Sequence, residues 1–89
     1  MPTRQLDIVN EKGLHARASA KFVEVVEAHE ASANVCREGL TAAGDSIMGL
    51  LMLAAAKGTS IEVETAGPDA EVLMDALAHL VADKFGEGM

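Results

Sequence analysis

The sequence is poor in aromatic and in basic residues. Its 89 residues include no tryptophan or tyrosine and only two phenylalanines, and seven lysines and arginines face fourteen aspartates and glutamates, for a net charge of −7. Surfaces that bind nucleic acid need clustered positive charge and aromatic side chains for stacking. We therefore expect no nucleic-acid partner. A phosphate or an acidic partner must be met by local positive features such as Lys12, Arg17, Lys21 and helix N-termini.

Long apolar runs and paired cysteines are also missing. The longest apolar stretch, Gly49 to Ala56, is only long enough for a helix within a domain, so we expect no membrane span. Arg4 and Asp7 interrupt any hydrophobic region near the N-terminus, so we expect no signal peptide. The single cysteine, Cys36, cannot form an internal disulfide, which fits a cytoplasmic protein. Its place in an alternating run predicts a small buried apolar residue.

Residues 1–89 are expected to form one domain with a modest core. Alternating apolar residues predict strands, and apolar residues at helical spacing predict helices. The predicted elements are strand Thr3–Val9, helix Ala16–His29, strand Ala33–Arg37, strand Leu40–Ala43, helix Ile47–Ala56, strand Ser60–Ala66 and helix Ala70–Phe85. This βαββαβα order predicts an α+β fold in which three helices cover one face of a four-stranded antiparallel sheet.

Four finer expectations concern one or two residues each. Glu38-Gly39 is typical of a two-residue hairpin turn. Ser46 can cap the helix that follows it. Val72 is expected on the buried side of the last helix, and Ser19 is expected at the surface.

The segment Gly13-Leu14-His15-Ala16-Arg17 is the most informative in the sequence. It places a histidine between a glycine-containing turn and the start of an apolar-periodic helix. Backbone N–H groups at a helix start lack partners and carry partial positive charge, which favours anions there. A neutral imidazole is a nucleophile, and a phosphoryl group that it accepted would meet amide donors and the Arg17 guanidinium. The segment therefore predicts a histidine that becomes phosphorylated.

A second motif, Gly44-Asp45-Ser46-Ile47-Met48-Gly49-Leu50, agrees with the first. Together the two segments resemble HPr, the family of histidine-containing phosphocarriers of the bacterial phosphotransferase system. The resemblance covers almost the whole chain and has the same order of elements. It implies the HPr-like open-faced sandwich.

The resemblance also implies roles for individual residues. His15 would be the phosphohistidine acceptor through its ring nitrogen nearer the backbone, Arg17 would stabilise the phosphate, and the backbone amides of Ala16 and Ala18 would cradle it. Enzyme I, charged by phosphoenolpyruvate, would supply the phosphoryl group, and an Enzyme II A-type protein would receive it. Such a chain is a monomeric relay substrate, not an enzyme, and needs no cofactor or metal. Many family members have proline after the arginine, so Ala18-Ser19 predicts a less rigid active loop.

Regulation and docking are expected around the second motif. In part of the HPr family a serine that matches Ser46 is phosphorylated by a dedicated kinase, HPr kinase/phosphorylase, which implies regulatory phosphorylation of Ser46. The helix that follows is apolar nearly all round, so some of its side chains should be exposed to partners. We expect Met48, Leu51, Met52 and Lys21 to form the docking surface.

Two alternatives remain open. Acidic chains with Ala-Ser after the arginine also resemble the nitrogen-related, regulatory branch of the family, in which the phosphate reports metabolic state and is not coupled to sugar uptake. A domain that is never phosphorylated, and only binds a ligand or another protein, is the second alternative. His29 and His79 lack ligand spacing to each other or to Cys36, so we expect no metal site.

Overall fold

The protein is described by a computed structural model that covers residues 2–86; Met1 and residues 87–89 of the expected domain lie outside the described part. The elements in chain order are β1 (Thr3–Asp7), α1 (Ala16–Glu27), β2 (Ser32–Arg37), β3 (Leu40–Ala43), α2 (Ile47–Met52), β4 (Ser60–Ala66), α3 (Ala70–Ala82) and a 3-10 turn, η1 (Lys84–Gly86). The predicted βαββαβα order is confirmed.

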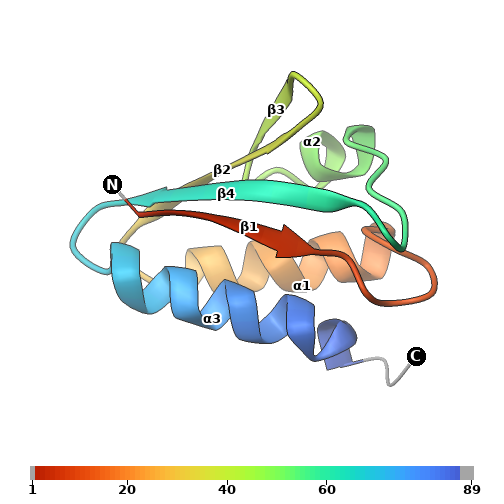
Figure 1. The fold of residues 1–89 in the computed structure, drawn as a ribbon. Helices are drawn as coiled ribbons and strands as arrows, with labels where there is room; N and C mark the ends of the chain where they lie inside the picture. Colours follow the sequence, from red (N-terminus) through yellow and green to blue (C-terminus); the bar gives the residue numbers. More distant parts are fainter. Residues whose placement is uncertain (1, 87–89) are drawn as a thin grey trace.

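The four strands form one antiparallel sheet in the order β1-β4-β2-β3. The register pairs Val35 of β2 with Val63 of β4 at the sheet centre, and both side chains are fully buried. Helices α1 and α3 run along the same face of the sheet, while α2 lies at the β3 end (Figure 1) and packs against α1 and β3. This arrangement is the open-faced sandwich that the sequence predicts.

The core lies between the sheet and the helices. Helix α1 contributes Phe22 and Val26, and α3 contributes Leu73, Leu77 and Val81, all buried. Their spacing of four residues places them on one side of each helix. Within residues 2–86, no helix combines the length and the apolar character needed to cross a membrane.

The hairpin between β2 and β3 forms as predicted. Glu38 and Gly39 have φ angles of 49° and 83°, and both are left-handed, as a two-residue turn between antiparallel strands requires. Strands β3 and β4 have the predicted bounds. The other ends differ slightly, since β1 ends at Asp7, α1 ends at Glu27 and β2 begins at Ser32.

Helix α2 is shorter than the sequence predicts. It ends at Met52, and Ala54 is left-handed with φ 52°. The carbonyl of Leu53 accepts a hydrogen bond from Arg37 Nη1 at 3.0 Å, and the carbonyl of Ala55 accepts one from Leu14 N at 2.8 Å. Contacts with distant segments therefore pair two carbonyl groups that a helix ending at Ala56 would leave without intrahelical partners.

The prediction of one long last helix is also wrong at its end. Helix α3 ends at Ala82, and Lys84 and Phe85 are left-handed with φ angles of 56° and 55°. This reversal turns the Phe85 ring into the core, where it is fully buried. Val72 is 59% exposed, contrary to expectation, because the buried side of the helix passes through Leu73.

Cys36 is half-buried and lies outside the core, so the prediction of a buried cysteine is wrong. Successive side chains of a strand point to opposite faces of the sheet. Val35 takes the core side, and Cys36 therefore lies on the face without helices.

Candidate functional site

His15 is the N-cap residue of α1. Its backbone is extended, with φ −78° and ψ −177°, and its side chain accepts a hydrogen bond from the helix. The donor is the backbone N–H of Arg17, which lies 3.2 Å from His15 Nδ1. A nitrogen that accepts a hydrogen bond carries a lone pair and no proton. The half-buried imidazole thus directs the lone pair of Nδ1 at the start of the helix.

The Arg17 amide is the donor that the sequence reasoning missed. The predicted cradle consisted of the amides of Ala16 and Ala18, whereas the structure directs the Arg17 N–H at Nδ1. Ala16 is exposed and Ala18 is fully buried. The signal was available, because an N-cap side chain usually bonds the amide two or three residues ahead. The cradle role of Ala16 and Ala18 stays a prediction.

The Arg17 side chain extends from the exposed side of the first turn of α1. Within the described residues, no ion pair engages its guanidinium. It is therefore available to an anion that arrives at the helix start. Lys21, one turn further on, is half-buried, and its Nζ donates to the carbonyl of Phe85 at 2.8 Å. That contact fastens the end of the described chain to α1.

The loop before His15 fits closely against the segment that follows α2. Gly13 has φ 64°, and a Cβ atom there would lie 2.3 Å from the carbonyl oxygen of Ala55. Only glycine tolerates both the left-handed backbone and this close approach. Leu14 N donates to the same Ala55 carbonyl at 2.8 Å. The position of His15 is thus set by a segment distant in the sequence.

An ion pair also joins this loop to the segment that follows α2. Lys57 Nζ lies 2.7 Å from Glu11 Oε1, and both side chains are exposed. The hydrogen bond and the positive charge of Lys57 lower the pKa of the Glu11 carboxyl.

Ser19 is fully buried, so the expectation of a surface serine is wrong. The buried stripe of α1 includes Ala18 and Ser19 as well as its large apolar residues. The Ser19 hydroxyl donates to the carbonyl of Leu14 at 3.3 Å. Asn10 is likewise fully buried, and its Nδ2 donates to the carbonyl of Gly13 at 2.8 Å. The sequence reasoning assigned no role to either side chain.

Ser46 is the N-cap residue of α2, as predicted. Its Oγ accepts a hydrogen bond from Gly49 N at 3.0 Å, and the side chain is half-buried. The preceding residue, Asp45, is exposed. This position is therefore a structural cap that solvent partly reaches.

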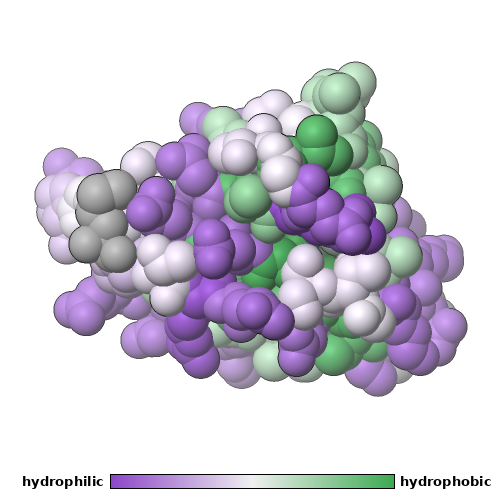
Figure 2. All heavy atoms as spheres, turned by 45° about the horizontal axis from the view of Figure 1, so that its top comes forward, coloured by the Kyte–Doolittle hydropathy of each residue, from purple (hydrophilic) through white to green (hydrophobic). Residues whose placement is uncertain are grey.

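Exposed apolar side chains gather around α2. Met48 is 69% exposed and Met52 is 74% exposed, whereas the predicted docking residue Leu51 is half-buried. Leu40 and Ile47 are also exposed and escaped the sequence prediction; we call Leu40, Ile47, Met48 and Met52 the apolar patch. Figure 2 shows hydrophobic side chains gathered over the end of the molecule where β3 and α2 lie. Helix α1 begins at that same end (Figure 1), so the apolar patch and His15 share it.

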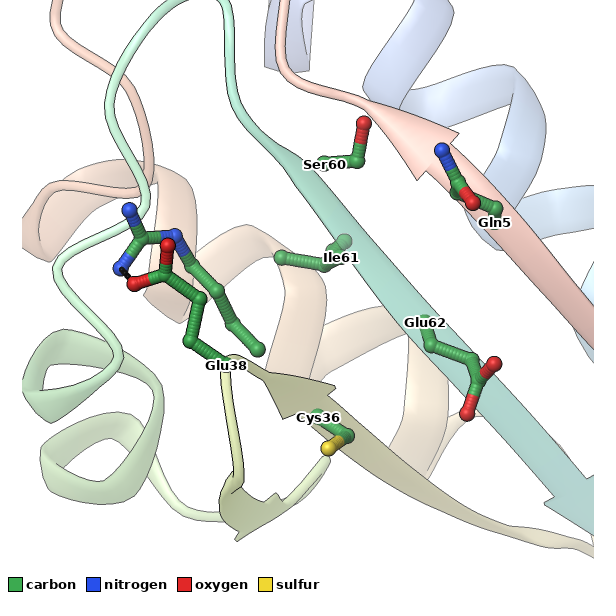
Figure 3. Close-up of a pocket in the computed structure, with 7 residues that line it drawn as sticks. Gln5, Cys36, Glu38, Ser60, Ile61 and Glu62 are labelled. Atoms are coloured by element: carbon green, nitrogen blue, oxygen red, sulfur yellow. Dashed lines mark ion pairs between the residues drawn. The ribbon is translucent and has the colours of Figure 1, made fainter.

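A shallow hollow of about 280 Å³ lies on the sheet face without helices. Gln5, Cys36 and Glu62 line it, and Arg37 forms an ion pair with Glu38 at its border, with Arg37 Nη1 3.4 Å from Glu38 Oε2 (Figure 3). Within the described residues, no group of three or more His, Cys, Asp or Glu side chains is arranged to hold a metal ion.

Comparisons with known proteins agree with the geometry. A family model described as the PTS HPr component phosphorylation site matches residues 2–83. The chain is 44% identical over 88 residues to phosphocarrier protein HPr of Cupriavidus necator, with 99% of each chain covered. It is 37% identical over 84 residues to phosphocarrier protein NPr of Shewanella violacea, which covers 94% of this chain and 92% of that relative. The structure superposes on HPr-C-His from Thermoanaerobacter tengcongensis with a TM-score of 0.94, at 31% identity and full coverage of both chains.

Proposed function

The chain belongs to the HPr family of phosphocarriers of the phosphotransferase system, and on this premise we propose that His15 carries the phosphoryl group. By the resemblance of its motifs, the group comes from Enzyme I and passes to an Enzyme II A-type protein. The observation that carries the proposal is the 3.2 Å hydrogen bond from Arg17 N to His15 Nδ1. Because Nδ1 accepts this hydrogen bond, it carries no proton, and its lone pair points at the start of α1.

In the proposed step, His15 Nδ1 attacks the phosphorus atom of a phosphohistidine on Enzyme I. The new N–P bond forms as the old N–P bond breaks, and the electron pair of the old bond returns to the donor imidazole. The Arg17 amide then donates to a phosphoryl oxygen, and the exposed Arg17 guanidinium supplies further charged donors. Transfer between two imidazoles is close to balanced, so modest stabilisation of the phosphate favours onward transfer.

The environments of the other two histidines support the choice of His15. His29 Nδ1 lies 2.7 Å from the carbonyl of Val25, a contact in which the ring nitrogen must donate its proton. That nitrogen is therefore not a free nucleophile. His79 lies near the C-terminal end of α3, far along its helix from the amide donors of the first turn.

The test is incubation with Enzyme I and phosphoenolpyruvate, followed by detection of an acid-labile, base-stable phosphoprotein. We expect wild type, His29→Ala and His79→Ala to be phosphorylated, and His15→Ala to accept no phosphate. His79→Ala is the matched control, because this exposed side chain can be removed without disturbing the core. Phosphorylation of His15→Ala would refute the proposal. Absence of phosphorylation of the wild type would favour a module that only binds a partner.

The nitrogen-related branch is a second candidate, and two observations favour it. Ala18-Ser19 follows the arginine, and a relative named NPr matches most of the chain. The phosphorylated protein should therefore be offered separately to a sugar-specific and to a nitrogen-related Enzyme II A protein. Faster loss of the phosphate to the nitrogen-related acceptor would assign the chain to that branch, and faster loss to the sugar-specific acceptor would assign it to the sugar branch.

Ser46 is proposed as a site of regulatory phosphorylation by an HPr kinase/phosphorylase. The serine is half-buried at the start of α2 and precedes Ile47 and Met48 of the apolar patch. A phosphate there would add about two negative charges beside the proposed docking surface. The expected consequence is weaker docking of Enzyme I and not an unfolded helix, because a helix start tolerates negative charge.

Ser46→Asp tests this consequence, with Ser32→Asp as a matched control. Ser32 is exposed at the start of β2, so the control adds the same charge away from the apolar patch. We expect Ser46→Asp alone to weaken binding to Enzyme I, with a smaller effect at high salt. Aspartate remains a good cap, so the melting temperature should change little. Equal affinities of the two variants at low salt would mean that Ser46 is only a cap.

A further inference from the structure

The two residues that precede His15 have every backbone polar group in a hydrogen bond. Gly13 N donates to the carbonyl of Asn10 at 3.2 Å, and Leu14 N donates to the carbonyl of Ala55 at 2.8 Å. The carbonyl of Gly13 accepts from Asn10 Nδ2 at 2.8 Å, and the carbonyl of Leu14 accepts from Ser19 Oγ at 3.3 Å. The N–H and the carbonyl group of each of these two residues are therefore held by hydrogen bonds.

The two side chains in this network are unusual in their burial. Within the described residues, only Asn10, Ser19 and Thr65 are buried polar side chains, and each is fully buried. A buried polar group costs free energy unless it is hydrogen-bonded, so it needs a structural or a functional reason. Two of the three converge on Gly13 and Leu14, whereas Thr65 lies at the other end of β4 and donates to the carbonyl of Ala70 at 2.8 Å.

Ser19 also holds His15 itself. Its backbone N–H donates to the carbonyl of His15 at 2.8 Å, while its hydroxyl donates to the carbonyl of Leu14. One residue of α1 thus fixes two consecutive carbonyl groups around the histidine. Any rotation of these peptides would move the imidazole away from the Arg17 amide, which lies only two residues ahead.

We propose that Asn10 and Ser19 are positioning residues for phosphoryl transfer, because they hold the Gly13–Leu14 segment so that His15 Nδ1 stays aligned with the amide donor of α1. This inference rests on the proposed function of His15. Under this proposal the Ser19 hydroxyl restrains the loop from inside, whereas Ala18-Ser19 in the sequence predicts a less rigid loop. Reactivity between two bound groups depends steeply on their alignment, so small displacements of Nδ1 slow transfer.

The experiment compares Ser19→Ala with Thr65→Val. Each change removes one fully buried hydroxyl that donates to a backbone carbonyl, but only Ser19 touches the loop before His15. We expect Ser19→Ala to lower kcat for transfer from phosphorylated Enzyme I about tenfold, with KM unchanged because the apolar patch is intact. Thr65→Val should transfer at the wild-type rate. Asn10→Asp, which keeps the shape but loses the amide donor, should behave like Ser19→Ala.

A second readout does not depend on transfer. In the unphosphorylated protein, hydrogen exchange of the Arg17 amide should be faster in Ser19→Ala and Asn10→Asp than in wild type, and unchanged in Thr65→Val. Equal kcat values for Ser19→Ala and Thr65→Val, or an unchanged exchange rate of the Arg17 amide, would overturn the positioning role of Asn10 and Ser19. The proposed function of His15 would still stand. Failure of the wild type to accept phosphate would instead overturn the proposed function, and amide exchange would still test whether the loop is held.

Discussion

The Nδ1 atom of His15 has two uses, since it caps α1 and is the proposed nucleophile. In the proposed mechanism, the N–H group that donates to Nδ1 in this structure would donate to a phosphoryl oxygen after transfer. The proposal thus gives Arg17 two roles, one through this amide and one through its exposed guanidinium.

Replacement of Arg17 by alanine should slow phosphoryl transfer without loss of stability. The guanidinium is exposed and its proposed role is electrostatic, so we expect a decrease of about tenfold or more in kcat/KM for at least one partner. Arg4→Ala is the control, because Arg4 is another exposed arginine and lies on β1. Its Nη1 pairs with Oδ1 of the exposed Asp75 of α3 at 3.8 Å. Equal transfer rates in the two variants would remove Arg17 from the site.

The Glu11–Lys57 pair predicts a local pH dependence. Lys57 lowers the pKa of the Glu11 carboxyl, so the pair stabilises the folded loop above the ordinary pKa of glutamate. That contribution is lost as the pH falls through the lowered pKa. Lys57→Met should raise the pKa of Glu11, which a carboxyl carbon NMR titration measures, and added salt should have the same direction of effect on wild type. Lys12→Met is the control, because Lys12 is an exposed lysine in the same loop, and it should leave the pKa of Glu11 unchanged. An unchanged pKa of Glu11 in Lys57→Met would contradict the role of Lys57.

Helix α2 is a short element whose end is fixed by contacts with residues outside the helix. Its six residues are too few to be stable alone, and their helical form depends on packing of Leu50 and on the Ser46 cap. The helix stops where Arg37 binds the Leu53 carbonyl and the chain turns left-handed at Ala54. This early end frees the following segment to support the loop before His15.

The left-handed backbone at Ala54 predicts a stabilising substitution. Alanine is strained at φ 52° and glycine is not, so Ala54→Gly should raise the free energy of unfolding by up to about 1 kcal/mol. Urea unfolding measures the change. Ala56→Gly is the control, because Ala56 is also exposed but is not left-handed, and there glycine should be neutral or destabilising by about 0.5–1 kcal/mol. A loss of stability in Ala54→Gly would show that the turn is held by other contacts.

In the whole molecule, the core lies on one side of the sheet, between the sheet and the helices. The described face opposite the helices is polar, and the proposed site lies at the end where α1 begins and α2 exposes methionines. The apolar patch and the Arg17 side chain are exposed and lie outside the core, so a partner can cover them without disturbing the core. Stability and docking should respond to different substitutions.

Two adjacent residues of α3 test this separation. Leu73 is fully buried and Val72 is 59% exposed. Leu73→Ala should lower the free energy of unfolding by about 2–5 kcal/mol because it leaves a cavity. Val72→Ala should change it by about 0.5 kcal/mol or less. Circular dichroism during urea unfolding measures both, and phosphoryl transfer by the folded fraction should be unchanged in either variant. Equal losses would mean that the side of α3 that packs on the sheet is misassigned.

The sequence by itself determined the features that depend on near neighbours. The bounds of β4 follow from alternation, and those of β3 follow from the Glu38-Gly39 turn before it and from Gly44 after it. Gly39 supplies a left-handed angle that such a turn needs. The cap at Ser46 follows from the chemistry of its own side chain. Each of these signals acts over a few residues, where propensity and periodicity are sufficient. The α+β order and the candidate histidine were within reach for the same reason.

Only the tertiary structure decided the features that depend on distant segments. The end of α2 lies where Arg37 binds the Leu53 carbonyl, and the support of the His15 loop requires the meeting of Leu14 with Ala55. The burial of Phe85 requires a left-handed reversal that carries its ring to the core, and the burial of Ser19 requires a loop carbonyl that can accept its hydroxyl proton. Helical periodicity predicts which side of a helix is apolar, but a buried hydroxyl is stable only where a partner from elsewhere in the fold satisfies it. That partner exists only once the chain has folded.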